Sequence, residues 1–95
     1  MAEGGSKHRS RSRIFADILR SIEVGENLKI THLLHSANVP HDRLVKYLAQ
    51  MEKSNLIARS GDGEGTAYTI TQKGRMYLVE FKKLEEFSSI FGVEI

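Results

Sequence analysis

The sequence predicts a mainly helical α+β domain organised around a helix-turn-helix. Leu44, Leu48 and Met51 recur at four- and three-residue spacing, which is typical of a helix with one buried side. Just before them, Asn38 suits the left-handed backbone that ends a helix, and Pro40 has its φ set for the first turn of another. We therefore expect a short helix, a tight turn and a longer second helix.

A first helix is expected ahead of this motif. Ser10 or Ser12 can cap it, because a serine oxygen accepts hydrogen bonds from the free N–H groups of an opening helical turn. Gly25 is suited to end the same helix. Its predicted buried side has i, i+4, i+5, i+8 spacing and consists of Ile14, Ile18, Leu19 and Ile22.

A brief edge strand and the short helix come next. Residues 28–30 are too few for a helix and alternate in polarity, which favours a strand. Thr31 is a suitable N-cap for the short helix. The apolar side of that helix contains Leu33, Leu34 and Ala37. The second helix of the motif then spans residues 40–54.

A β-hairpin follows the second helix. Asn55 comes first, and asparagine tolerates the positive φ that often follows a helix. Residues 56–60 and 66–70 predict two strands joined by the glycine-rich turn 61–65. This succession of elements is that of a winged helix-turn-helix, with a three-helix core and a β-hairpin wing.

An additional C-terminal helix completes the predicted fold. Thr71 caps it, and it runs from about residue 72 to residue 91, roughly 30 Å at ~1.5 Å per residue. A seam with 4-3-3-4 spacing, close to a heptad, is formed by Tyr77, Phe81, Leu84, Phe87 and Phe91. Because so small a domain cannot cover the later members, we expect these five to form a dimer interface. The alternative is that this helix folds back along the first helix of its own chain.

Size and composition fit one small cytoplasmic domain. The 95 residues include no cysteine, so neither a disulfide framework nor a thiolate metal site is expected. No apolar run approaches the ~18–20 residues of a membrane span. The N-terminus also lacks the apolar stretch of a signal peptide.

The charge is concentrated in an N-terminal arm, residues 1–11, and its continuation into the first helix. The formal net charge is +2, yet ten basic and eleven acidic residues remain when five charged residues are set aside, Glu3, Lys7, Arg9, Arg11 and Arg13. The rest of the chain is therefore close to neutral. A basic, glycine- and serine-rich arm is typical of a flexible segment attracted to polyanions. The alternative is a tail that only improves solubility.

Several short motifs together resemble a known family. The most specific of them is Tyr-Thr-Ile-Thr-Gln-Lys-Gly at residues 68–74. The others lie in the helix-turn-helix and after it, at Thr31, Ala37-Asn38, Leu44, Tyr47-Leu48 and Asn55-Leu56-Ile57. Over about residues 12 to 91 the chain resembles the archaeal winged helix-turn-helix family of small dimeric DNA-binding proteins, which includes chromatin-associated members.

This resemblance implies a winged-helix fold, DNA binding, and dimerisation through the C-terminal helix as an antiparallel coiled coil. The chain differs from the family pattern at the wing tip, which carries Asp62 and Glu64. Carboxylates there are repelled by the phosphate backbone, so a strong wing contact with DNA is not expected.

The outward face of residues 40–54 supplies candidate DNA contacts. Arginine binds guanine and glutamine binds adenine through paired hydrogen bonds, whereas lysine suits phosphates. We therefore expect Arg43 and Gln50 to contact bases, and Lys46 and Lys53 to contact the backbone. His41 lies at the entrance of this helix and Tyr47 on its flank. The remaining candidates are Arg59 in the wing and Arg9, Arg11 and Arg13 in or after the arm, which can enter a minor groove.

The sequence shows no pattern that indicates catalysis, a metal site or a cofactor site. His32 and His35 are spaced i, i+3, but no third ligand lies nearby, so we expect two exposed polar side chains. The turn 61–65 lacks the Lys-Ser/Thr pair of a phosphate loop and the acidic spacing of a calcium loop. No nucleophile, base and orienting group are placed together, so an enzyme is not expected.

The sequence therefore predicts three parts: a basic arm at 1–11, a winged helix-turn-helix domain at 12–74, and a dimerisation helix and tail at 75–95. The predicted function is that of a homodimeric, nucleoid-associated DNA-binding protein, either a transcriptional regulator or an architectural chromatin factor. Its predicted partners are double-stranded DNA and a second copy of itself, with no small-molecule ligand. The alternative is a winged-helix module that binds proteins and not DNA.

Overall fold

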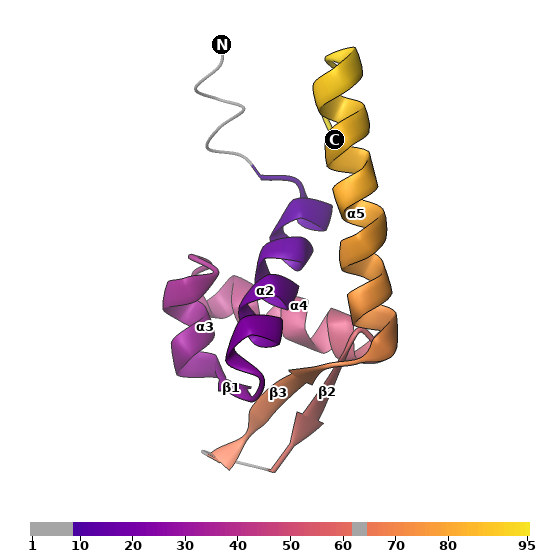
Figure 1. Cartoon of the computed structure of the whole chain (residues 1–95). Coiled ribbons are helices and arrows are strands. Elements are labelled where there is room, and N and C mark those ends of the chain that lie inside the picture. The colour runs from indigo at the N-terminus through magenta and orange to yellow at the C-terminus, as the bar shows by residue number, and fades with distance from the viewer. Residues whose placement is uncertain (1–8, 62–64) are drawn as a thin grey trace.

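A computed structural model describes residues 9–61 and 65–95 of the chain. Three helices pack together beside a small antiparallel sheet, and a long C-terminal helix stands next to the first of them (Figure 1). The elements in order are α2 (Arg11–Gly25), β1 (Leu28–Lys29), α3 (Ile30–Ser36), α4 (His41–Lys53), β2 (Ile57–Ser60), β3 (Ala67–Ile70) and α5 (Gln72–Phe91). This order confirms the predicted winged-helix fold. No described helix is long and apolar enough to cross a bilayer.

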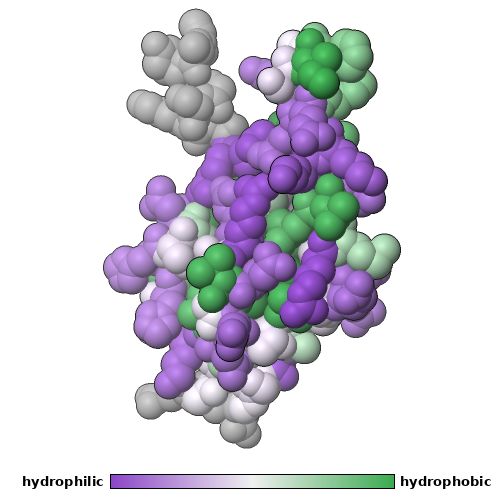
Figure 2. All heavy atoms as spheres, in the orientation of Figure 1, coloured by the Kyte–Doolittle hydropathy of each residue, from purple (hydrophilic) through white to green (hydrophobic). Residues whose placement is uncertain are grey.

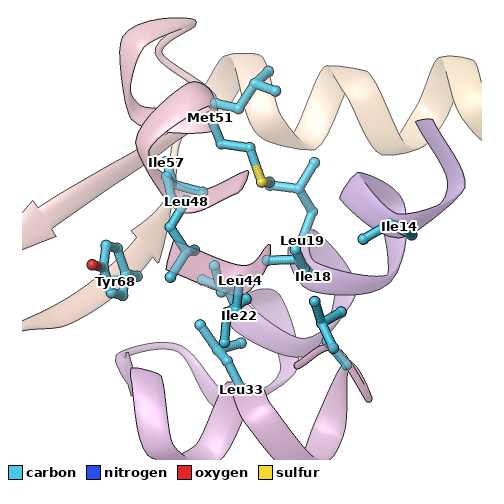
Figure 3. Packing of buried hydrophobic residues seen from close by; sticks show 13 residues of the cluster. Ile14, Ile18, Leu19, Ile22, Leu33, Leu44, Leu48, Met51, Ile57 and Tyr68 are labelled. Carbon is cyan, nitrogen blue, oxygen red and sulfur yellow. The ribbon is translucent and has the colours of Figure 1, made fainter. Parts of the chain in front are cut away.

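The core lies between α2, α3, α4 and the sheet (Figure 3). All four residues of the predicted α2 stripe are buried, and Ser10 caps this helix by accepting a hydrogen bond from the Arg13 N–H. On α4 the predicted inward residues Leu44, Leu48 and Met51 are also buried. Each such side chain removed from water stabilises the fold by about 1.5–3 kcal/mol. The core therefore fixes which side of α4 faces out.

The turn between α3 and α4 has the expected geometry. Asn38 has φ +54°, in the left-handed region that often follows a helix. Pro40 has φ −59° and ψ 149°, so it precedes the helix as its N-cap, and α4 begins at His41. Ser54 is the C-cap, which makes α4 one residue shorter at each end than predicted. Asn55 has φ +64°, as expected for the residue after the helix.

The predicted N-cap of α3 is wrong. The helix begins at Ile30, its N-cap is Lys29, and no side chain caps it. The sheet is the cause. Lys29 pairs with Ala67 in β3, so its backbone is extended, and the helix begins at the next residue. Thr31 therefore falls inside the first turn of α3.

The sheet has the order β1-β3-β2, with both neighbouring pairs antiparallel. The hairpin of β2 and β3 is the wing, and its register runs from Ile57 opposite Ile70 to Ser60 opposite Ala67. β1 forms the other edge, as expected for a brief edge strand. Asp62 and Glu64 of the predicted acidic wing tip lie outside the described residues.

The start of α5 is fastened to the segment between α4 and β2. Thr71 caps the helix by accepting from the Gly74 N–H at 3.0 Å, and its hydroxyl donates to the carbonyl oxygen of Asn55 at 2.6 Å. Gly74 packs directly on Leu56, so that a Cβ there would overlap the Leu56 carbonyl oxygen and lie 2.7 Å from Ile70 Cγ1. Only glycine fits this approach. The cap and the bounds of α5 are as predicted.

α5 packs against α2 from its first turns to Glu85, whereas its C-terminal end extends past the domain (Figure 1). Phe81 is buried, and the Tyr77 hydroxyl donates to the carbonyl oxygen of Ser12 at 2.7 Å. The guanidinium groups of Arg13 and Arg20 lie 5.4 and 5.9 Å from the centre of the Phe81 ring. α5 therefore does pack along α2, as the alternative interpretation expected, but only as far as Glu85, which pairs with Arg13 and Arg20 of α2.

Candidate nucleic-acid interface

The outward face of α4 carries the predicted DNA-contacting residues together. At 3.6 residues per turn, Lys46 and Lys53 lie on the side opposite the buried leucines. Arg43 and Gln50 lie together toward one flank of the same face. Both lysines, Arg43 and Gln50 are exposed, as is His41 at the start of the helix. Because the opposite side of α4 is buried in the core, the cations and the amide of Gln50 face solvent.

The three cations on α4 are not neutralised by ion pairs within the described part of the chain. Arg43, Lys46 and Lys53 form no ion pair with any residue of 9–61 or 65–95. Asp42 lies on the same helix, but its fully exposed carboxylate is 3.9 Å from His41 Nδ1. A cation without an internal partner binds a phosphate without first giving up an ion pair.

Tyr47 and Arg59 are placed differently from the exposed set. The half-buried ring of Tyr47 packs edge-on against Phe15, with centroids 5.6 Å apart. Arg59, on β2, pairs through Nε with the Glu52 carboxylate at 3.3 Å. Opposite it in the sheet, burial raises the pKa of Tyr68, with the Glu52 charge adding to this effect and Arg59 opposing it. Both predicted site residues therefore take part in packing or pairing within the chain.

The arginines at the arm are held to the body of the domain. Arg9 donates to the Asp17 carboxylate at 2.8 Å and to the carbonyl oxygens of Ala37 and Asn38 at 3.0 and 2.7 Å. Those two carbonyls belong to the turn between α3 and α4. Arg9 therefore ties the segment before α2 to the entrance of α4. Its guanidinium caps carbonyls that a helix end leaves without partners.

Arg13 links α2 to α5 and does not project freely. It pairs with Glu85 at 3.1 Å, while Arg20 holds the other oxygen of the same carboxylate at 3.0 Å. Arg20 also pairs with Asp17 at 3.6 Å, which completes a chain of charges from Arg9 to α5. Arg11, at the first residue of α2, is exposed. The rest of the predicted basic arm, residues 1–8 with Lys7, lies outside the described residues.

The sequence could not have shown these attachments. Asp17 and Glu85 look like ordinary surface residues in the sequence, because Arg9 lies eight positions from Asp17, and Arg13 and Arg20 lie 72 and 65 positions from Glu85. Only the i, i+3 spacing of Asp17 and Arg20 gives a local signal.

The predicted dimer residues divide into two groups. Tyr77 is half-buried and Phe81 buried against α2, whereas Leu84, Phe87 and Phe91 remain 48%, 49% and 65% exposed. Met76, Val79 and Ile90 lie outside the predicted seam and are also more than half exposed on α5. A helical projection of the whole α5 sequence would have identified these three apolar residues. Apolar residues gather at the free end of α5 (Figure 2).

A groove runs along the first half of α5 beside this exposed face. Its walls are mainly apolar and include Leu56, Met76, Tyr77, Phe81 and Leu84, and its volume is about 360 Å³. Lys73 and Glu80 lie at its edge. Elsewhere, His32 and His35 are both exposed, and residues 9–61 and 65–95 contain no group of three side chains suited to hold a metal ion.

The comparisons with known proteins agree with this architecture. A family model described as winged helix-turn-helix matches residues 8–89, while a search of curated protein sequences found no match. Among solved structures, the chain is similar to Sso10a-2, a DNA-binding protein from Sulfolobus solfataricus. The TM-score is 0.77 at 23% identity, over 85% of this chain and 83% of that one.

Two bacterial structures are similar as well. One is a putative transcriptional regulator from Pseudomonas aeruginosa, with TM-score 0.70 and 18% identity over 88% of this chain and 59% of that one. The other is a MarR family protein from Bacillus stearothermophilus, with TM-score 0.66 and 16% identity over 90% and 61%. This chain thus spans about three fifths of their length. At such identities these likenesses show the fold, and the family model, which covers most of the sequence, shows that the chain belongs to the winged helix-turn-helix family.

Proposed function

We propose that the chain is a homodimeric DNA-binding protein, a transcriptional regulator or an architectural chromatin factor, that inserts α4 into the major groove. The observation that carries this proposal is the outward face of α4, where Arg43, Lys46 and Lys53 are exposed without ion pairs to described residues. An α-helix fits the major groove, and unpaired cations release counterions from phosphates.

The residues on α4 have distinct proposed roles. Lys46 and Lys53 contact phosphates and set the position of the helix, whereas Arg43 and Gln50 form hydrogen bonds with base edges. His41 contacts a phosphate near the start of α4. Tyr47 supports the helix by packing against Phe15.

The arm and the wing have smaller proposed roles. Arg11 and the basic residues before Arg9 contact phosphate or the minor groove. Arg9 and Arg13 act mainly by holding α2 against the turn and against α5. Arg59 contacts a phosphate only after exchanging Glu52 for it, so its contribution is small.

Self-association through α5 completes the proposal. The side chains of Leu84, Phe87 and Phe91, in the C-terminal half of α5, remain about half exposed or more. Exposed apolar patches of this kind usually mark an interface. A two-fold dimer presents two copies of α4, which favours a palindromic site with half-sites about 34 Å apart, one helical turn of DNA, or a multiple of that distance. The likeness in fold to Sso10a-2, described as a DNA-binding protein, supports the proposal.

Salt-dependent binding to duplex DNA tests the function directly. Fluorescence anisotropy on a random-sequence duplex is expected to give binding that weakens with salt. Lys46→Ala and Lys53→Ala should each reduce the slope of log K against log salt by about 0.9 for every phosphate that is no longer neutralised. Lys82→Ala, which removes an exposed lysine from α5, is the matched control and should leave the slope unchanged. A wild-type protein that does not bind DNA even at low salt would instead favour a protein-docking module.

A further inference from the structure

Two carbonyl oxygens of the turn between α3 and α4 accept hydrogen bonds from one side chain outside the motif. Arg9 donates from Nη1 to the Ala37 carbonyl at 3.0 Å and from Nη2 to the Asn38 carbonyl at 2.7 Å. Pro40 has no N–H to offer these oxygens. The core fixes the apolar side of the same turn, because Ala37 and Val39 are buried. Arg9 therefore helps to fix how α4 follows α3.

Asp17 orients this guanidinium. Its Oδ2 atom accepts from Arg9 Nη1 at 2.8 Å, and the side chains of Arg9 and Asp17 are only 27% and 29% exposed. Arg20 pairs with the other oxygen, Oδ1, at 3.6 Å. Asp17 also lies on α2 directly before the fully buried Ile18 and Leu19, so the core fixes the position of its carboxylate. Arg9, Asp17 and the two carbonyls of the turn together form the Arg9–Asp17 clamp.

The clamp needs the shape of an arginine as well as its charge. The planar guanidinium carries five N–H donors in a fixed arrangement, so one group can bridge a carboxylate and two carbonyls. A lysine ammonium has the same charge but is a compact group on a flexible stem. Arg9→Lys therefore keeps the charge at this position and loses the bridge.

The clamp lies where the basic arm enters the domain. Arg11 is two residues beyond Arg9 and is exposed at the first residue of α2. Consecutive Cα atoms are about 3.8 Å apart, so the Cα atoms of Arg9 and Arg11 are no more than about 8 Å apart. Cations fixed near the start of α4 lose less conformational freedom on binding phosphate than cations on a free tail. The arm and α4 can then contact one continuous stretch of DNA.

We propose that Asp17 is a positioning residue for DNA binding, which acts through Arg9 to hold the basic arm and the entrance of α4 in one fixed arrangement. The inference rests on the proposed DNA binding and goes beyond it by assigning a role to a carboxylate that does not touch DNA. Removing a carboxylate ordinarily strengthens binding to a polyanion, because a repulsive charge is lost. Removing the Asp17 carboxylate should instead weaken it.

Fluorescence anisotropy on a random-sequence duplex at low salt tests this sign in the full-length protein. Asp17→Asn should raise the DNA dissociation constant about tenfold, because the side chains of the arm are then ordered only on binding. Glu85→Gln is the matched control, since it removes the same charge from the other carboxylate that pairs with Arg20 but leaves the hydrogen bonds of Arg9 in place. The control should bind at least as tightly as the wild type. Each variant is measured well below its melting temperature, so that all are folded.

Two further variants separate positioning from a direct contact and from a loss of stability. Arg9→Lys should bind like Asp17→Asn if Arg9 belongs to the clamp, and like the wild type if Arg9 contacts a phosphate. Arg11→Ala should cost less affinity in the Asp17→Asn background than in the wild type, because the arm is then no longer held. A general loss of stability would leave the cost of Arg11→Ala the same in both backgrounds.

The possible failures are distinguishable. A wild type that does not bind duplex DNA even at low salt would overturn the proposed function itself. A wild type that binds, with Asp17→Asn binding equally or more tightly, would overturn only the clamp. Wild-type affinity of Arg9→Lys, a loss in Glu85→Gln equal to that in Asp17→Asn, or an equal cost of Arg11→Ala in both backgrounds would do the same.

Discussion

The helices α4 and α5 both have an apolar buried side, but their exposed sides are opposite in character. Each buries part of its surface against the domain, α4 through Leu44, Leu48 and Met51 and α5 mainly through Phe81. The outward face of α4 is then mainly charged or polar, with Val45 exposed on its flank. The outward face of α5 carries Met76, Val79, Leu84, Phe87, Ile90 and Phe91.

This difference assigns the two faces to different partners. Unpaired cations in water attract a polyanion and gain little from contact with an apolar surface. Exposed leucine and phenylalanine side chains gain free energy only when another apolar surface removes them from water. The same domain therefore presents one face suited to a polyanion and another suited to an apolar partner, which agrees with the proposed function.

Positive charge alone does not mark a binding face. Arg13 and Arg20 are cations like Lys46 and Lys53, yet both hold Glu85 and lie over the Phe81 ring. They hold α5 in place. The cations on α4 differ because no described carboxylate pairs with them.

The largest expected effect comes from placing a charge in the apolar face of α5. In the proposed dimer, Leu84→Glu removes two leucines from the interface at about 1.5–3 kcal/mol each, which corresponds to a dissociation constant raised roughly 100-fold or more. Sedimentation of the variant should give a monomer at concentrations where the wild type is dimeric. Val45→Glu, a similarly exposed position on α4, should remain dimeric. Equal behaviour of the two variants would contradict the contrast between the helices.

The second prediction concerns how α5 is attached. Gly74→Ala forces a methyl group onto the Leu56 carbonyl, and overpacking of this kind costs about 1–3 kcal/mol. The melting temperature should fall by roughly 4–8 °C for each kcal/mol. Gly65→Ala is the control, because no atom of the described residues lies within 4 Å of a Cβ there. Equal melting temperatures for the two variants would show that the close approach at Gly74 has no energetic weight.

The third prediction separates base contacts from phosphate contacts on α4. Gln50→Ala should relax sequence preference at one base position by about 1–3 kcal/mol. It should not change the salt slope, because no charge is removed. Selection from a pool of random duplexes, followed by salt titration, measures both quantities. An unchanged preference together with a reduced slope would place Gln50 against the backbone.

The smallest expected effect is at the ion pairs between α2 and α5. Glu85→Gln weakens the pairs with Arg13 and Arg20 at 3.1 and 3.0 Å, and partly exposed pairs contribute less than about 1 kcal/mol. Urea denaturation should reveal the loss at low salt and little of it at high salt. Glu80→Gln, whose partner Lys83 lies on the same exposed helix, should cost still less. A loss that persisted at high salt would require a role beyond charge pairing.

Local patterns in the sequence predicted most of the fold. The stripes on α2 and α4, the caps at Ser10 and Thr71, and the positive φ of Asn38 and Asn55 are all present. Such features depend on neighbours within a few residues, so periodicity and residue type are enough to find them. Thr31 was mispredicted as a cap because the pairing of Lys29 with Ala67, far along the chain, decided where α3 begins.

By itself, then, the sequence determined the elements, the inward side of each helix and the identity of the charged residues. It did not determine which charges are available. Arg9, Arg11 and Arg13 are alike in the sequence, but their tertiary contacts differ. Arg9 donates hydrogen bonds to the turn before α4, and Arg13 pairs with Glu85. Arg11 remains exposed. The folded chain also decided that α2 covers α5 only as far as Glu85. Both outcomes depend on contacts between residues distant in sequence, and neither spacing nor composition encodes such contacts.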